Sequence, residues 1–208
     1  MPQTIWTPRM QAMRRLIEGE EIVQRSREAQ KLVLDFIKKH EGYRQKAYWD
    51  DIGKKWTVGH GHTYMKDPVT GKMRAVAEGD EMDEATSSSL VSSRLRDMAS
   101  QMYTNLKWSR YLSPKALAAM LDVAYNSGVG TLYPDKSPNL NKSMNAPGAD
   151  RDAIVWRELP TYRTSGGRVV KGLENRRADA RTEFGPQPQQ NVAQTSAPAV
   201  EQPAAGPA

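Results

Sequence analysis

Two carboxylates and a hydroxyl lie close together in the sequence where a helical pattern gives way to a strand pattern. Glu41 ends an amphipathic run, Asp50 opens a turn, and Thr57 lies in the segment that returns from this turn. The C-terminal end of a helix carries partial negative charge, which disfavours ionised Glu41 and suits a general acid. The wet, charged surroundings of Asp50 favour its ionised form, and the Thr57 hydroxyl can hold a water beside it. Two carboxyl groups in opposed environments are typical of acid–base catalysis.

The spacing of these residues also has an interpretation without catalysis. Glu followed by Asp nine positions later occurs by chance in many chains. Glu41 would then be a surface acid at a helix end, and Asp50 a turn-forming residue. The surrounding elements must therefore decide between the two interpretations.

The helix that would carry Glu41 is predicted by apolar residues at helical spacing, which are Ala29, Leu32, Val33, Phe36 and Ile37. Gly42 follows as its C-terminal cap. An earlier helical run begins at Thr7-Pro8, a capping hydroxyl followed by proline, and extends to Gly19. Its basic and acidic residues are mixed, which favours a solvated face over a nucleic-acid-binding arm.

Turn signals replace the helical period between positions 43 and 73, and they predict a small antiparallel sheet there. Helices resume near Asp83 and at Ser113-Pro114, and two short ones are predicted at 149–159 and 175–184. We therefore expect an α+β fold, with the small antiparallel sheet at one end and a helical bundle forming the rest. Trp108 and Trp156 are expected in its core.

The chain has 208 residues and no cysteine, and its formal charge is +6. This length predicts one domain with appendages. We divide it into a helical N-terminal extension at 1–28, a domain at 29–185 and a disordered tail rich in Pro, Ala and Gln at 186–208. The absence of cysteine excludes a disulfide scaffold and a thiol nucleophile.

Several kinds of partner and cofactor are not expected. No apolar stretch is long enough to span a membrane, and charged residues interrupt any signal-peptide core near the N-terminus. His40, His60 and His62 are candidates for a zinc site, with the last two on one strand face, but a packed histidine pair is the favoured interpretation, so we expect no metal and no cofactor. The basic surplus suits an anionic cell envelope, and nucleic acid is not expected as a partner.

Several motifs together resemble the phage-type lysozymes of the T-even kind, glycoside hydrolase family 24. The motifs occur in the family's order, as Glu41-Gly42-Tyr43-Arg44, Tyr48-Trp49-Asp50, Thr57-Val58-Gly59-His60-Gly61-His62, Ala124-Tyr125-Asn126-Ser127-Gly128 and Gly172-Leu173-Glu174-Asn175-Arg176-Arg177. The resemblance covers about three quarters of the chain, from 29 to 184. It implies a lysozyme-like fold.

The resemblance also implies a reaction, the hydrolysis of the β-1,4 bond between N-acetylmuramic acid and N-acetylglucosamine in peptidoglycan. Glu41 would protonate the leaving oxygen, while Asp50 and Thr57 would position the attacking water. This arrangement implies inversion, with the carboxyl groups ~6.5–9.5 Å apart. Arg176 matches the arginine that pairs with the catalytic glutamate, and this pairing opposes the effect of the helix end on Glu41.

Further site residues follow from the same resemblance. Tyr43 and Asn126 are candidates for lining the sugar cleft, and His62 matches a sheet histidine that pairs with an acid on the next helix. Serines occupy the expected place of that acid, so the partner of His62 is open; they are Ser88, Ser89, Ser92 and Ser93. The proline-rich segment 133–138 departs from the family pattern at an edge of the groove.

Two biological settings are compatible with the resemblance. A phage-encoded enzyme would remain in the host cytoplasm until a holin releases it to the wall, or it would be carried in the virion. The main alternative is a non-catalytic structural or wall-binding virion component with the same fold. Residues 1–28 would contact a virion or a second copy of the chain, or would pack on their own domain.

Overall fold

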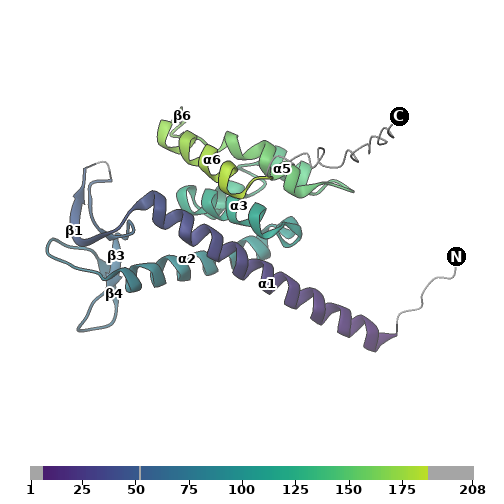
Figure 1. Ribbon diagram of the computed structural model, residues 1–208, viewed down its shortest axis with the longest axis horizontal. Helices are drawn as coiled ribbons and strands as arrows, with labels where there is room; N and C mark the ends of the chain where they lie inside the picture. The colour runs from purple at the N-terminus through teal and green to yellow at the C-terminus, as the bar shows by residue number, and fades with distance from the viewer. Residues whose placement is uncertain (1–6, 52, 187–208) are drawn as a thin grey trace, which may run out of the picture.

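The computed structural model describes residues 7–51 and 53–186, except for the side chain of Met10. It is mainly helical, with short antiparallel hairpins (Figure 1). The α-helices are α1 Pro8–Glu41, α2 Glu84–Asn105, α3 Pro114–Ser127, α4 Pro138–Met144, α5 Arg151–Glu158 and α6 Lys171–Phe184. The strands are β1 Arg44–Asp50, β2 Lys55–Gly59, β3 Tyr64–Lys66, β4 Met73–Ala75, β5 Thr164–Ser165 and β6 Arg168–Val169.

Helix α1 is one continuous helix of 34 residues, where the sequence predicted two successive helical runs. Gly19 does not end the first run, because one glycine costs a helix only about 1 kcal/mol and the neighbouring residues favour the helix. The predicted boundary between extension and domain, at 28/29, thus falls inside α1. The predicted tail lies outside the described residues except for Pro186.

Helix α3 is the centre of the helical bundle, and it contacts α1, α2, α5 and α6 (Figure 1). Every residue of α3 from Ala116 to Tyr125 is buried. The predicted starts of two helices are confirmed, since Asp83 caps α2 and Ser113 caps α3 through side-chain oxygens. Trp108 and Trp156 are buried, as predicted.

The strands between α1 and α2 form two separate hairpins, β1–β2 and β3–β4, in place of one sheet (Figure 1). Val58, Val76 and Met82 form a small core beneath them. Arg74 holds the second hairpin: it donates to Asp80 at 2.6 Å, and this bond lowers the pKa of Asp80 to about 2.

A third hairpin, β5–β6, lies before α6 and was not predicted from the sequence. Its turn is Gly166-Gly167, and both glycines have positive φ. This hairpin lies in the sequence between α5 and α6, within the helical part of the chain. No helix in the described ranges combines the length and the hydrophobicity that crossing a bilayer requires.

Candidate active site

Glu41 is the last residue of α1, and the chain turns sharply after it. Gly42 has a φ of 67°, and its N–H donates to the carbonyl of Lys38 at 3.1 Å, which closes the helix as predicted. The Glu41 carboxylate faces Gly61, since a Cβ on Gly61 would lie 3.6 Å from Glu41 Oε2. The Glu41 side chain is 29% exposed, so the acid is partly screened but reachable.

Asp50 and Thr57 share one face of the first hairpin. Tyr48 pairs with Thr57, and Asp50 pairs with Lys55, at the end of the hairpin next to the turn. Residues directly opposite each other in an antiparallel pair point to the same face, as do residues two apart on a strand. Asp50 and Thr57 are therefore diagonal neighbours on that face, as their proposed joint action requires.

The surroundings of these two side chains differ sharply. Thr57 is 5% exposed, and its hydroxyl oxygen has no hydrogen-bond partner among the described residues. A buried hydroxyl without a protein partner is a natural site for a bound water. Asp50 is only partly buried, and its carboxylate lies over the turn, so close that a Cβ on Gly53 would be 2.5 Å from Asp50 Oδ2. Gly53 is thus required for the position of the carboxylate.

A chain of ion pairs through α6 and α3 fixes Glu41. Arg176 of α6 donates from Nη1 to Glu41 Oε1 at 2.6 Å and from Nε to Asp122 Oδ1 at 2.9 Å. Burial lowers the pKa of Arg176, but the charge of Asp122 and the bonds to Asp122 and Glu41 outweigh it, so this pKa is raised overall. The predicted pairing of Arg176 with Glu41 is thus present in the structure.

Asp122 is a site residue that the sequence interpretation missed. Its side chain is fully buried in α3, where it accepts from both Arg176 and Arg177. Arg177 also donates to the carbonyl of Tyr162 at 3.0 Å. The sequence did contain a signal for this role. Asp122 is an acidic residue within an otherwise apolar helix, and a buried charge needs a partner.

Ser87 of α2 is the partner of His62, and it is not one of the serines considered from the sequence. His62 Nε2 lies 3.0 Å from both the carbonyl and the hydroxyl of Ser87. A carbonyl only accepts, so this contact places the proton on Nε2. The Ser87 hydroxyl also accepts from the His60 N–H at 2.9 Å. Through these bonds α2 holds the turn that faces Glu41.

The sequence suggested that His60 and His62 share one strand face, and this expectation is wrong. Strand β2 ends at Gly59, and a tight turn then brings His62 back to pair with Val58. Gly59 makes this packing possible, because its φ is 64° and any Cβ would collide with the Ser87 side chain. His60 Nδ1 lies 2.5 Å from the carbonyl of Gly42. In the described part of the chain, no three His, Asp or Glu side chains are grouped as metal ligands.

The two candidates for lining the sugar cleft have structural contacts of their own. The Tyr43 hydroxyl donates to the carbonyl of Met82 at 2.7 Å, and its ring packs near that of His60. Asn126 donates to the carbonyl of Asp122 at 2.7 Å and lines a hollow together with Arg176. Tyr43 thus supports the hairpin, and Asn126 lies beside the ion-pair chain.

The chain matches one family model and is similar to individual relatives. The model of the phage lysozyme family matches residues 38–180, which include every candidate site residue. The endolysin of Bacillus phage PZA is 28% identical over 162 residues, 76% of this chain and 55% of the endolysin. The chain therefore spans about half the length of this curated relative.

Two solved structures have the same fold. The active form of the P1 phage endolysin Lyz matches with a TM-score of 0.58 and 20% identity, over 74% of this chain and 82% of its own. A mutant of the phage P22 lysozyme matches with a TM-score of 0.57 and 22% identity, over 73% of this chain and 94% of its own. These likenesses confirm the predicted α+β, lysozyme-like fold.

The contacts of His62 predict how stability depends on pH. Burial lowers the pKa of His62 below its ordinary value, despite the bond to the Ser87 carbonyl. The unfolded chain takes up this proton near pH 6.5, whereas the folded protein takes it up only at lower pH, so acid favours unfolding. We expect the free energy of unfolding to fall as pH drops below about 6.5, and His62→Gln to reduce that fall.

Urea unfolding at a series of pH values between about 7.5 and 5 measures this effect. His40→Gln is the matched control, because it removes a histidine and leaves His62 in place. An equal loss of stability in wild type and His62→Gln would contradict the prediction.

Proposed function

Since the chain belongs to the phage lysozyme family, we propose that it is a muramidase that hydrolyses the β-1,4 bond between N-acetylmuramic acid and N-acetylglucosamine in peptidoglycan. The observation that carries the proposal is the contact of Glu41 with Arg176 at the end of α1. A structural or wall-binding module would not require a partly exposed glutamate held by a buried arginine. The alternative of a non-catalytic virion component is therefore not favoured.

Glu41 is the general acid in the proposed mechanism. It gives its proton to the oxygen that leaves when the glycosidic bond breaks. Arg176 stabilises the carboxylate that the step produces, because its guanidinium already lies 2.6 Å from Oε1. Arg176 thus acts on the state of Glu41 that follows proton transfer.

Asp50 and Thr57 supply the other half of the mechanism. The Thr57 hydroxyl binds the attacking water, and Asp50 accepts the proton of this water as its oxygen bonds to the anomeric carbon. Attack from the face opposite the leaving group inverts the configuration. The shared hairpin face of Asp50 and Thr57 supports this assignment, as does the buried, unpartnered hydroxyl of Thr57.

The glycan strands of peptidoglycan are the proposed substrate, with Asn126 and Tyr43 near the bound sugars. We further propose that the protein is phage-encoded and reaches the wall either through holin-dependent release from the host cytoplasm or as part of a virion. Contacts of residues 1–28 with a virion or with a second copy belong to the same proposal.

Glu41→Gln tests the catalytic assignment, because it keeps the shape of the side chain and removes the proton donor. We expect clearing of purified sacculi, stripped of outer membrane, to slow by at least about 100-fold. Reducing-end analysis of the wild-type products is expected to show new muramic acid ends. Asp50→Asn should show a similar loss, whereas Asp51→Asn, the neighbouring exposed acid, should stay near wild type.

Circular dichroism and thermal unfolding establish that each variant is folded. No clearing by folded wild-type protein would reject the muramidase proposal. Equal clearing by wild type and Glu41→Gln would reject the role of Glu41.

Gly53→Ala tests the position of the Asp50 carboxylate without changing a reactive group. The added Cβ would lie 2.5 Å from Asp50 Oδ2, so the carboxylate must move. We expect the clearing rate to fall about 10-fold or more, since small misplacements of catalytic groups are costly. Gly19→Ala is the matched control, because nothing lies within 4 Å of its added Cβ and it is far from the site. Unchanged clearing by Gly53→Ala would contradict the assigned position.

A further inference from the structure

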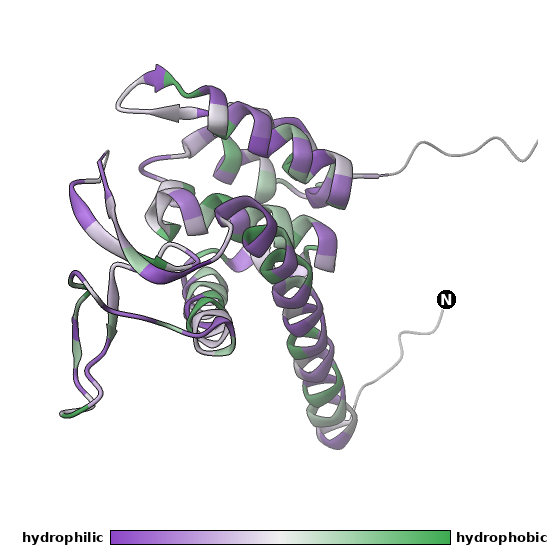
Figure 2. Ribbon diagram, turned by 60° about the vertical axis from the view of Figure 1, so that its left-hand side comes forward, coloured by the Kyte–Doolittle hydropathy of each residue, from purple (hydrophilic) through white to green (hydrophobic). Residues whose placement is uncertain are grey.

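His60 is a buried histidine that the proposed mechanism does not use. It is 2% exposed and lies in the turn after β2, between two glycines with positive φ, Gly59 and Gly61. Figure 2 shows, as Figure 1 does, that the first hairpin lies at the end of the molecule where α1 finishes and α2 begins. The turn that carries His60 is therefore placed to contact both helices.

Two hydrogen bonds tie His60 to these helices. Its backbone N–H donates to the Ser87 hydroxyl of α2 at 2.9 Å, and its ring Nδ1 lies 2.5 Å from the carbonyl oxygen of Gly42. Gly42 directly follows Glu41 and closes α1. The His60 side chain thus joins the end of α1, which carries the acid, to a turn that α2 supports.

The partners of the ring indicate which nitrogen carries its proton. A carbonyl oxygen only accepts, so Nδ1 of His60 is the donor to Gly42. Nε2 is buried and has no hydrogen-bond partner among the described residues. A proton on Nε2 would be a buried donor without an acceptor, which is costly. His60 therefore has the opposite tautomer to His62, whose Nε2 donates to the Ser87 carbonyl.

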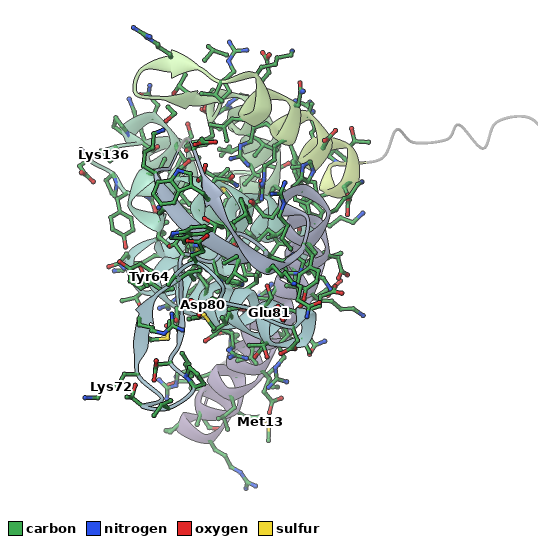
Figure 3. The ribbon with its side chains drawn as sticks, turned by 90° about the vertical axis from the view of Figure 1, so that its left-hand side faces the viewer. Met13, Tyr64, Lys72, Asp80, Glu81 and Lys136 are labelled. Carbon is green, nitrogen blue, oxygen red and sulfur yellow. The ribbon has the colours of Figure 1, made fainter. Side chains whose placement is uncertain are left out.

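The segment before α2 fixes Ser87 relative to the first hairpin. The Ala47 N–H of β1 donates to the carbonyl of Asp80 at 2.8 Å, and Lys46 pairs with Glu81 as neighbouring strands do. Figure 3 shows Asp80 and Glu81 near the middle of the view, beside the hairpins. Since α2 begins directly after this segment, the hydroxyl that receives the His60 N–H has a fixed position.

The turn also faces the reactive atom of Glu41. Arg176 donates to Oε1 of Glu41, and the carbonyl-type oxygen of a protonated carboxyl group is the better acceptor, so the proton of the acid is placed on Oε2. Oε2 is the oxygen that faces Gly61, where an added Cβ would lie 3.6 Å from it. His60 precedes Gly61, so its bond to Gly42 sets the position of the turn relative to Oε2.

We propose that His60 is a positioning residue for the general acid and acts through the hydrogen bond from Nδ1 to the Gly42 carbonyl. Arg176 holds one carboxylate oxygen of Glu41 from α6, and His60 holds the backbone next to Glu41 from the turn. The role rests on the proposed function, because it concerns the acid of that mechanism. The proton transfer itself belongs to Glu41.

His60→Asn and His60→Leu form a matched pair that tests this role. The two side chains have nearly the same shape, but only Asn places an N–H close to the position of Nδ1 and can still donate to Gly42. With a soluble, uncrosslinked glycan strand, we expect His60→Leu to lower kcat at least about 10-fold and to leave KM within about 3-fold of wild type, because the acid is misplaced while sugar binding is retained. His60→Asn should restore kcat to within about 3-fold of wild type.

The tautomers are measured independently of activity. Long-range proton–nitrogen NMR spectra of the full chain, labelled with nitrogen-15 histidine, distinguish protonated from bare ring nitrogens at a pH of about 8, above the ordinary pKa of histidine. We expect the proton on Nδ1 in His60 and on Nε2 in His62. The signals of each ring are assigned by their loss in His60→Asn and in His62→Gln.

Circular dichroism and urea unfolding establish that both His60 variants are folded under the assay conditions. Equal kcat values in His60→Asn and His60→Leu, or an effect of His60→Leu on KM alone, would overturn the positioning role. A proton on Nε2 of His60 in the wild-type protein would overturn the bond to Gly42, whether or not the variants fold. No hydrolysis by folded wild-type protein would reject the muramidase proposal and the positioning role with it, whereas the NMR spectra would still decide the bond.

Discussion

The buried charge of Asp122 is the constraint on which the site depends. It lies in α3 with no solvent exposure and accepts from two consecutive arginines of α6. Removing one partner of such a buried pair leaves an uncompensated charge, at a cost of about 3–5 kcal/mol. The arginines are therefore held in place, and Arg176 donates from Nη1 to Glu41.

This interaction joins segments that are far apart in the chain. Glu41 ends α1, Asp122 lies in α3, and Arg176 lies in α6, so the acid is fixed only once the helical bundle has formed. The first hairpin carries Asp50 and Thr57, and Ser87 of α2 holds the turn that faces Glu41. The acid and the proposed water site thus lie on separate elements, each with its own support.

Local patterns predicted much of this arrangement. The end of α1 at Glu41-Gly42, the return of the chain through Thr57, and the caps at Asp83 and Ser113 follow from short-range spacing and turn chemistry. The partners of His62 and Asp122 could not be predicted from these local patterns. Nothing local links Ser87 to His62 or Asp122 to Arg177, because these bonds depend on how the helices pack. The prediction that a helical run ends at Gly19 was also wrong, because the neighbouring helix formers outweigh a single glycine.

The stereochemistry of the product tests the central claim most directly, because it depends on where the attacking water is held. Proton NMR of a soluble, uncrosslinked glycan strand, recorded immediately after the enzyme is added, shows which anomer of the new reducing end forms first. A water held by Thr57 and Asp50 opposite Glu41 predicts the α-anomer, which mutarotation then converts in part to the β-anomer. Initial formation of the β-anomer would mean retention, and it would contradict the roles assigned to Asp50 and Thr57.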